Sequence, residues 1–306
     1  MILVVLAGLA GGVSLLVGAS GLGWPPPEIL WQIRLPRALL ALLCGLALGA
    51  SGASLQGLLR NRLADPGLLG FSGCASLGAV LAFYFGAAAL TPVALPAAAL
   101  AGALGGALLL LGFTRRADGT TLVLAGVALA ALASAALTLA LALAPSPFAL
   151  AEITTWLLGS LEDRAAVHVV LAAPPILLGA VLLLATRGGL DALALGEATG
   201  KSLGVDPARL ARITALGVAL CVGGATAVAG SVGFVGLIVP NLLRARLGER
   251  PSALVWPAAW AGAVLLALAD IAVRLIPTAQ ELRLGVLTAL LGAPVLAWAA
   301  LKGNRA

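Results

Sequence analysis

The chain has 306 residues, of which 61% are hydrophobic and 10% are charged, and its net charge is +6. A soluble domain carries about 25% charged residues, so this composition excludes a water-soluble globular protein, whose surface it could not cover. The basic residues stand singly or in pairs between apolar runs, which excludes the basic patch of a nucleic-acid-binding protein.

Stretches long enough to cross a bilayer follow one another along the chain, since a spanning helix needs about 20 mostly apolar residues. They are apolar on all faces, whereas barrel strands would be about ten residues with alternating polarity. We predict spans at residues 2–22, 37–58, 70–88, 94–113, 121–143, 167–186, 209–229, 233–247, 254–275 and 284–302. The chain is therefore expected to be an all-α polytopic membrane protein with about ten transmembrane helices and a single permease domain, residues 1–306.

Two features of these spans predict their packing. Small residues recur four positions apart, which allows helices to approach closely. These pairs are Gly8/Gly12, Gly45/Gly49 and Gly102/Gly106. The eighth span is short and contains Pro240, so we expect it to be broken or tilted.

The basic residues predict the orientation, because Lys and Arg concentrate in cytoplasmic connections. With the N-terminus inside, 13 of the 18 Lys and Arg residues are cytoplasmic. These are Arg60, Arg62, Arg115, Arg116, Arg187, Lys201, Arg209, Arg212, Arg244, Arg246, Arg250, Lys302 and Arg305. The outer residues are Arg34, Arg37, Arg164, Arg274 and Arg283. Both termini are therefore predicted to be cytoplasmic.

Two polar connections stand out. The outer segment 145–164 contains an amphipathic run, Ile153 to Leu161, for which we predict a short interfacial helix. The cytoplasmic segment 187–212 contains Leu195-Gly-Glu-Ala-Thr-Gly-Lys-Ser202, which falls short of a phosphate-binding loop because Gly196 and Gly200 are too close together and no strand precedes it. We interpret it as a compact turn-and-helix element whose glycines allow close contact with a partner.

Outer charged residues are candidates for docking a partner. Asp270 and Arg274 are four residues apart and share a helix face, so they can pair and still present the arginine outward. Arg34 and Arg37 flank Pro36 at the outer start of the second span. One interpretation is that they anchor the helix at the membrane interface. The other is that they dock an acidic partner, because positively charged residues are usually concentrated on the cytoplasmic side and these two are predicted outside.

Ser134 and Thr138 give the fifth span one mildly polar stripe, which either bonds back to the helix carbonyls or lines a solute pathway. The single histidine, His168, at a span edge has no plausible nucleophile and acid partners, so no catalytic site is predicted. Cys44, Cys74 and Cys221 lack metal-ligand spacing, so no metal site is predicted either.

An ordered set of motifs identifies a family. Trp31-Gln-Ile-Arg-Leu-Pro-Arg37, Arg60-Asn-Arg-Leu-Ala-Asp-Pro66, Gly230-Ser-Val-Gly-Phe-Val-Gly-Leu-Ile-Val-Pro240, Leu268-Ala-Asp-Ile-Ala-Val-Arg274, Glu281, and Thr288-Ala-Leu-Leu-Gly-Ala-Pro294 follow in order. This set resembles the permeases of type II ATP-binding-cassette importers for siderophores, haem and cobalamin. Within that family the sequence is most similar to the cobalamin permeases.

The resemblance implies a homodimeric permease of the bacterial inner membrane, with two cytoplasmic ATPase subunits and a periplasmic binding protein as partners. It implies no cofactor on this chain, with ATP–Mg bound by the ATPase subunits. Arg34, Arg37 and Arg274 match binding-protein docking positions. The coupling segment corresponds to Gly196, Glu197 and Gly204, and the pathway helix carries Ser134 and Thr138.

The chain departs from the family pattern at Arg62, Asn241 and Arg283, where Pro, His and Pro are usual. These departures leave the cargo open among cobalamin, ferric siderophores and haem. An ion-coupled secondary transporter is the rival class, although such proteins usually carry ionisable residues at mid-membrane, and here only Asp270 lies within a span, near its end.

Overall fold

The computed structural model describes residues 1–18, 21–87, 91, 93–113, 119–276, 278 and 281–303. In chain order the elements are α1 (Ile2–Leu16), β1 (Val17–Gly18), β2 (Gly21–Leu22), α2 (Pro27–Ile29), the π-helical η1 (Leu30–Arg34), α3 (Leu35–Leu59), α4 (Phe71–Tyr84), α6 (Ala94–Phe113), α7 (Gly119–Ala142), α8 (Pro147–Leu157), α9 (Ala166–Ala185), α10 (Arg187–Ala194), α11 (Glu197–Ser202), α12 (Pro207–Ala229), α13 (Val235–Leu247), α14 (Pro251–Leu275) and α15 (Leu284–Gly303). Arg115, Arg116 and Arg305 of the cytoplasmic set lie outside the described residues.

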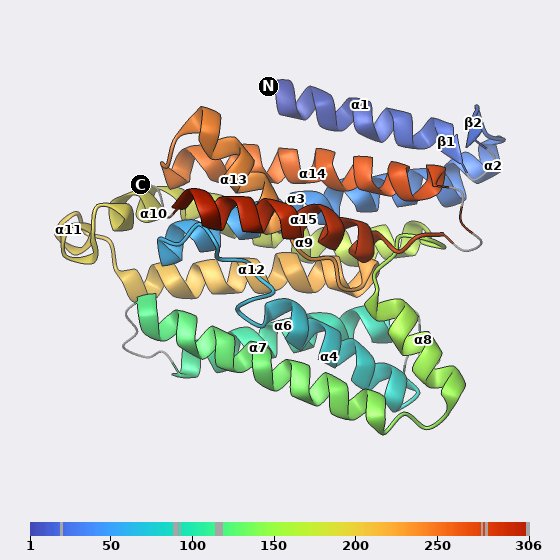
Figure 1. Cartoon of the computed structure of the whole chain (residues 1–306), viewed down its shortest axis with the longest axis horizontal. Helices are drawn as coiled ribbons and strands as arrows, with labels where there is room; N and C mark the ends of the chain where they lie inside the picture. Colours follow the sequence, from blue (N-terminus) through green and yellow to red (C-terminus); the bar gives the residue numbers. More distant parts are fainter. Residues whose placement is uncertain are drawn as a thin grey trace.

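The long helices run side by side along the long axis of the molecule (Figure 1). α10 and α11 lie at one end of the bundle, here called the α11 end. The β1–β2 hairpin, α2 and α8 lie at the opposite end, here called the hairpin end. Each predicted span coincides with a helix, which confirms an all-helical polytopic membrane protein.

Six of the described helical stretches are long and apolar enough to cross a membrane. They are Pro27–Leu59, Ala94–Gly112, Thr121–Ala142, Ala166–Ala185, Pro207–Ala229 and Pro251–Leu275. Three shorter apolar helices, Ile2–Leu16, Phe71–Tyr84 and Leu284–Ala297, accompany them.

The structure corrects three predicted boundaries at the hairpin end. The first helix ends at Leu16 and not at 22, because β1 and β2 form an antiparallel hairpin with Val17 opposite Leu22. The second span begins earlier, at Pro27, where α2 and η1 run directly into α3. The interfacial helix is Pro147–Leu157, because the Ser146 side chain caps its start by accepting from Ala149 N at 3.1 Å.

α3 lies at the centre of the bundle and packs against α14, α12, α9 and α13. A Cβ on Gly45 or Gly49 would overlap backbone oxygens of α14, so the predicted close approach is confirmed for this pair. Gly102 meets the backbone oxygen of Cys74 on α4 in the same way, whereas Gly106 faces the Cys74 side chain. A Cβ on Gly8 or Gly12 would meet nothing within 4 Å, so this pair makes no close helix contact within the described chain.

α13 is one continuous helix, so of the two alternatives predicted at Pro240, a break or a tilt, the break is wrong. Proline has no N–H to donate to the carbonyl four residues earlier, that of Gly236. Gln56 of α3 fills this role, since its Nε2 donates to Gly236 O at 3.3 Å. A side chain from a neighbouring helix therefore satisfies the carbonyl that would otherwise favour a break.

Candidate functional site

Four charged side chains from α3, α14 and the segment before α15 form an ion network near the hairpin end. Arg37 donates from Nε to Asp270 Oδ1 at 2.9 Å, and its terminal nitrogens contact both carboxylate oxygens of Glu281. Asp270 Oδ2 pairs with Arg274 Nη2 at 2.9 Å. The cluster holds two positive and two negative charges, and this neutrality suits its burial, since Asp270 is fully buried and Arg37 is 7% exposed.

The predicted pairing of Asp270 with Arg274 is confirmed, and it fixes the direction of the arginine. Arg274 Nη1 donates to the carbonyls of Ser14, at 3.0 Å, and Val17, at 2.8 Å. These carbonyls are at the C-terminal end of α1, where a cation is favoured by the helix dipole. Arg274 therefore joins α14 to α1, and its guanidinium is engaged within the chain.

Arg34 is held differently from the other two arginines predicted to dock a partner. Its Nη1 donates to Leu15 O at 2.8 Å and Gly23 O at 3.0 Å, both neutral acceptors. The residue is half-buried, and among the described residues it has no carboxylate partner. Of the three, Arg34 retains the most unbalanced charge.

A second ion pair lies near the network. Arg283 Nη1 contacts Glu162 Oε2 at 2.9 Å and joins the segment before α15 to the one after α8. Neither Glu281 nor Glu162 was assigned a role from the sequence, because their partners are 244 and 121 residues away and no local spacing signals such contacts.

The segment 187–212 forms the compact turn-and-helix element predicted from its sequence. Helix α10, not a strand, precedes Gly196, and α11 begins directly after it. Gly196 and Gly204 have positive φ values of 108° and 83°, which glycine adopts without strain. Glu197 pairs with Lys201 at 2.9 Å along the exposed face of α11.

Asp191 attaches α10 to the start of α14. Its carboxylate accepts hydrogen bonds from the Ser252 backbone N at 2.8 Å, the Ser252 hydroxyl at 2.6 Å and Arg250 Nε at 2.7 Å. Burial opposes ionisation of Asp191, yet these bonds from Ser252 and Arg250 hold its pKa below the usual value. These bonds join α10 to the start of α14.

Ser134 and Thr138 of α7 are joined by a hydrogen bond along their own helix. Thr138 Oγ1 donates to Ser134 O at 2.9 Å, as the back-bonding interpretation predicted. Both side chains are exposed on the surface of this chain. His168 also has a local role, because its Nδ1 accepts from Ala165 N at 3.1 Å at the start of α9.

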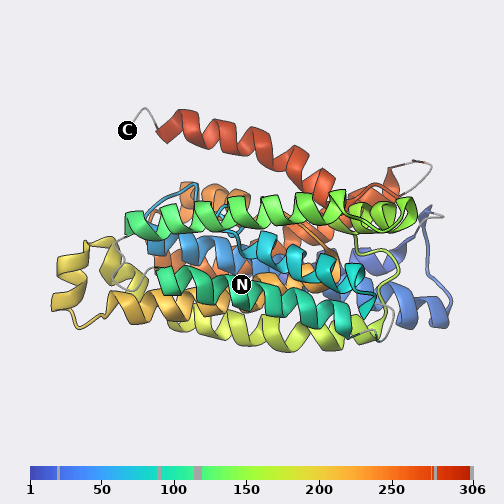
Figure 2. The same ribbon diagram turned by 90° about the horizontal axis from the view of Figure 1, so that it is seen from below.

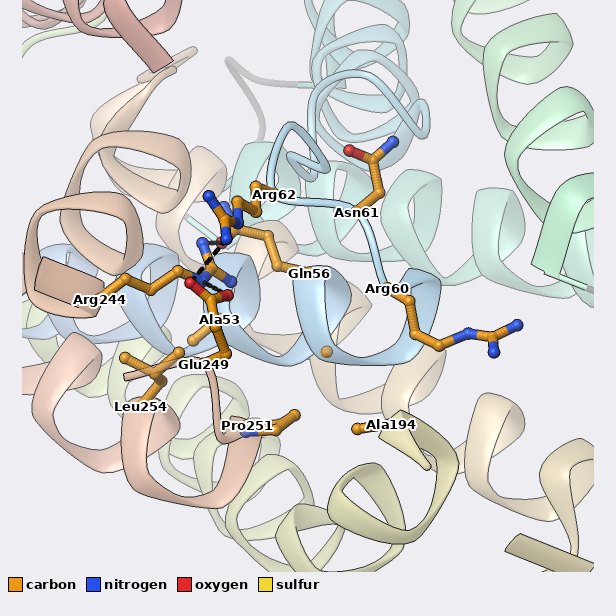
Figure 3. Close-up of a pocket in the computed structure, with 11 residues that line it drawn as sticks. Ala53, Gln56, Arg60, Asn61, Arg62, Ala194, Arg244, Glu249, Pro251 and Leu254 are labelled. Carbon is orange, nitrogen blue, oxygen red and sulfur yellow. Dashed lines mark hydrogen bonds and ion pairs between the residues drawn. The ribbon is translucent and has the colours of Figure 1, made fainter. Parts of the chain in front are cut away.

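A cavity of about 200 Å³ opens near the α11 end, between the end of α3, the following loop, α10 and the start of α14 (Figure 3). Its lining residues are Ala53, Gln56, Gly57, Arg60, Asn61, Arg62, Ala194, Arg244, Glu249, Pro251 and Leu254. Glu249 lies between two arginines, 2.9 Å from Arg62 Nη2 and 3.2 Å from Arg244 Nε. The lining is of mixed polarity, and its charged residues are three arginines and one glutamate.

Comparison with known proteins gives consistent results. Residues 3–302 match the model of the FecCD transport family. The chain is 41% identical to the Vitamin B12 import system permease protein BtuC of Vibrio cholerae, covering 89% of this chain and 82% of that protein. It is 38% identical to BtuC of Salmonella typhi, covering 100% and 93%. A solved structure, described as an inward-facing conformation of a proposed metal-chelate type ABC transporter, superposes with a TM-score of 0.89 at 30% identity, covering 98% and 97% of the two chains.

Proposed function

The chain belongs to the FecCD transport family, as a permease of type II ATP-binding-cassette importers for metal chelates, and we propose that its cargo is cobalamin. The observation that carries the cargo proposal is the identity of 38% to 41% with two vitamin B12 permeases along almost the whole chain. The chain is a multi-pass protein of the bacterial inner membrane, and ATP hydrolysis belongs to separate subunits.

In the proposed assembly, residues 1–306 form one permease domain with ten spans and both termini in the cytoplasm. Two copies enclose the pathway on a two-fold axis, and two ATPase subunits with bound ATP–Mg contact their cytoplasmic ends. A periplasmic binding protein docks on the outer ends. The opposite positions of the arginine network and of α10–α11 support this arrangement (Figure 1).

In the proposed mechanism, acidic lobes of the binding protein meet Arg34, Arg37 and Arg274. Carboxylates of this chain already pair with Arg37 and Arg274, so Arg34 makes the first contact. Arg37 and Arg274 can bind the acidic lobes only by giving up their pairs within the chain. Charge contacts of this kind mainly align the two proteins and speed their association, and they contribute less to the affinity of the complex.

ATP binding then closes the ATPase subunits against the coupling segment, which includes Gly196, Glu197 and Gly204. Asp191 passes the motion of α10 to α14 through its bonds to Ser252 and Arg250. Ser134 and Thr138 line the pathway in this proposal. Their weak polarity suits release, because a lining that bound the cargo tightly would retain it.

Uptake measurements test the cargo. The permease, its ATPase subunits and its binding protein are reconstituted in vesicles, and uptake of labelled cobalamin is compared with that of a ferric siderophore and of haem. We expect ATP-dependent cobalamin uptake only. Uptake of another chelate in its place overturns the cargo proposal, and uptake without ATPase subunits favours an ion-coupled transporter.

A further inference from the structure

We propose that the basic cavity near the α11 end binds a phosphate-type anion. Three arginines line it, Arg60, Arg62 and Arg244, whereas Glu249 is the one carboxylate among its lining residues. Figure 3 shows Arg62, Arg244 and Glu249 converging, with Arg60 on the rim and its guanidinium directed away from them. The cavity therefore has more positive charge than its own acid neutralises.

Arg244 is the buried cation of the site, because its side chain is 10% exposed. Its Nη1 donates to Gln56 Oε1 at 2.6 Å and to Asn241 Oδ1 at 2.9 Å. Its Nε is buried and makes no hydrogen bond among the described residues, although Glu249 lies 3.2 Å away. Neutral partners thus fix the guanidinium while part of its donor capacity stays unused.

The Glu249 carboxylate shows what kind of ligand the cavity accepts. It contacts Arg62 and Arg244 together, which places one oxyanion between two guanidinium groups. Its side chain is 59% exposed, and it follows Gly248, whose φ is 77° and whose surroundings are open. Glu249 can therefore swing outward and leave its position to a phosphate, which arginines bind with similar geometry and greater charge.

Asn241, a residue that departs from the family pattern, contacts both Arg62 and Arg244. Asn241 Nδ2 donates to the backbone carbonyl of Arg62 at 3.1 Å, and Asn241 Oδ1 accepts from Arg244. The two cytoplasmic departures, Arg62 and Asn241, thus meet in one site although 179 positions separate them. They supply one arginine and the amide that holds both.

Two sources can provide such an anion: the phosphate of an anionic lipid headgroup, or free phosphate. Basic pockets between membrane helices on the cytoplasmic side bind anionic headgroups. The inference rests on the proposed function in one respect, the membrane leaflet that would supply the lipid. The proposed orientation places the α11 end at the cytoplasmic leaflet. The nature of the cargo does not enter it.

Lipid retention is the first test. The full chain is purified in detergent with phosphatidylglycerol or phosphatidylcholine, and the retained lipid is counted by native mass spectrometry. We expect selective retention of phosphatidylglycerol, about fivefold weaker in Arg62→Gln, since one arginine near the surface contributes about that factor. We expect stronger retention in Glu249→Gln, which removes the internal competitor.

Arg246→Gln is the matched control, because Arg246 is exposed on the same helix as Arg244 and does not line the cavity. It should retain lipid as the parent does. In a second arm, inorganic phosphate is added to the chain in phosphatidylcholine nanodiscs and the unfolding temperature is followed. A rise with phosphate that Arg62→Gln abolishes, without lipid selectivity, assigns the site to soluble phosphate.

Two results overturn the proposal. The first result has two parts. Lipid retention falls equally in Arg62→Gln and Arg246→Gln, or does not rise in Glu249→Gln, and in addition phosphate does not change the unfolding temperature. The other is that the cavity variants weaken only the association with the ATPase subunit, which would make the cavity a protein contact. Cobalamin uptake is not a readout, so failure here is distinguishable from failure of the proposed cargo.

Discussion

At the residue scale, Arg37, Arg274, Asp270 and Glu281 pair with one another within the bundle, and their pairs connect distant parts of the chain. Asp270 shares its carboxylate between Arg37 and Arg274, each at 2.9 Å. The sequence predicted the pair of Asp270 with Arg274, because these residues are four positions apart on one helix face. Arg37 is 233 residues from Asp270, so its contact depends on how α3 packs against α14.

Asp270→Asn should destabilise the fold strongly, because it removes one of two negative charges from a buried cluster with two cations. Breaking a buried ion pair costs about 3–5 kcal/mol. The measurement is thermal unfolding in detergent. Glu162→Gln is the control: its pair with Arg283 is partly exposed, so the expected cost is about 0–1 kcal/mol. Equal losses in the two variants would contradict the role of the network.

Arg34→Glu should slow association of the binding protein about tenfold at low salt, with a smaller effect at high salt. Arg34 is the suitable docking residue to change, because changing Arg37 or Arg274 would also disturb the buried network. Association rates at two salt concentrations measure the effect. Arg246→Glu, the same charge reversal at an exposed arginine of α13, should have little influence. Unchanged association of Arg34→Glu would remove Arg34 from the docking surface.

At the element scale, glycines decide how closely the central helices approach. Gly45, Gly49 and Gly52 of α3 each lie where a Cβ would overlap backbone atoms of α14 or α13. The spacing of Gly8 and Gly12 in α1 looks the same in sequence, yet these two meet open surroundings. Spacing alone therefore identifies helices that can pack closely, and the fold decides which of them do.

Gly49→Leu should separate α3 from α14 and reduce stability by about 3 kcal/mol or more, because overpacking a tight contact forces backbone shifts. Gly12→Leu introduces the same side chain where nothing lies within 4 Å and should be tolerated. The fraction of protein that stays monodisperse after heating in detergent measures both. Comparable loss in the two variants would show that the close approach is not limiting.

Gly204→Trp should stop transport while the assembled complex still hydrolyses ATP, if the coupling segment contacts the ATPase. Its φ is 83° and its surroundings are open, so an added side chain projects outward. Gly86→Trp is matched in strain and openness, with a φ of 70°, but lies after α4, away from the coupling segment. Uptake and ATPase rates should be near normal for Gly86→Trp. Normal uptake by Gly204→Trp would refute the coupling role.

At the scale of the whole molecule, two helices lie on one side of the bundle with apolar side chains exposed. Figure 2 shows α15 and α7 on the same side, with α9 on the opposite side. Leu132 and Leu139 of α7 and Leu290 of α15 are each at least 60% exposed. This face, with the Ser134–Thr138 stripe within it, suits the two-fold contact of the proposed homodimer.

Thr138→Cys should form a cross-link between two copies if α7 lies at the two-fold axis. Cys44, Cys74 and Cys221 are all buried, so the new thiol would be the accessible one. Cross-linked dimer on a denaturing gel is the measurement. Val181→Cys places an exposed thiol on α9, on the opposite face, and should give none. Equal cross-linking at both positions would exclude α7 from a specific contact.

The sequence alone determined the class of protein and the positions of its helices, because hydropathy, proline and glycine govern local structure over one or two helical turns. It also determined the family, through its ordered motifs. It also predicted the local pair of Asp270 with Arg274 and offered the Thr138 bond to Ser134 as one of two alternatives. Only the tertiary structure decided which arginine meets which carboxylate and that Arg62 and Asn241 share a site. Those contacts join helices that are more than a hundred residues apart in the chain. A local sequence pattern does not predict which distant helices pack together.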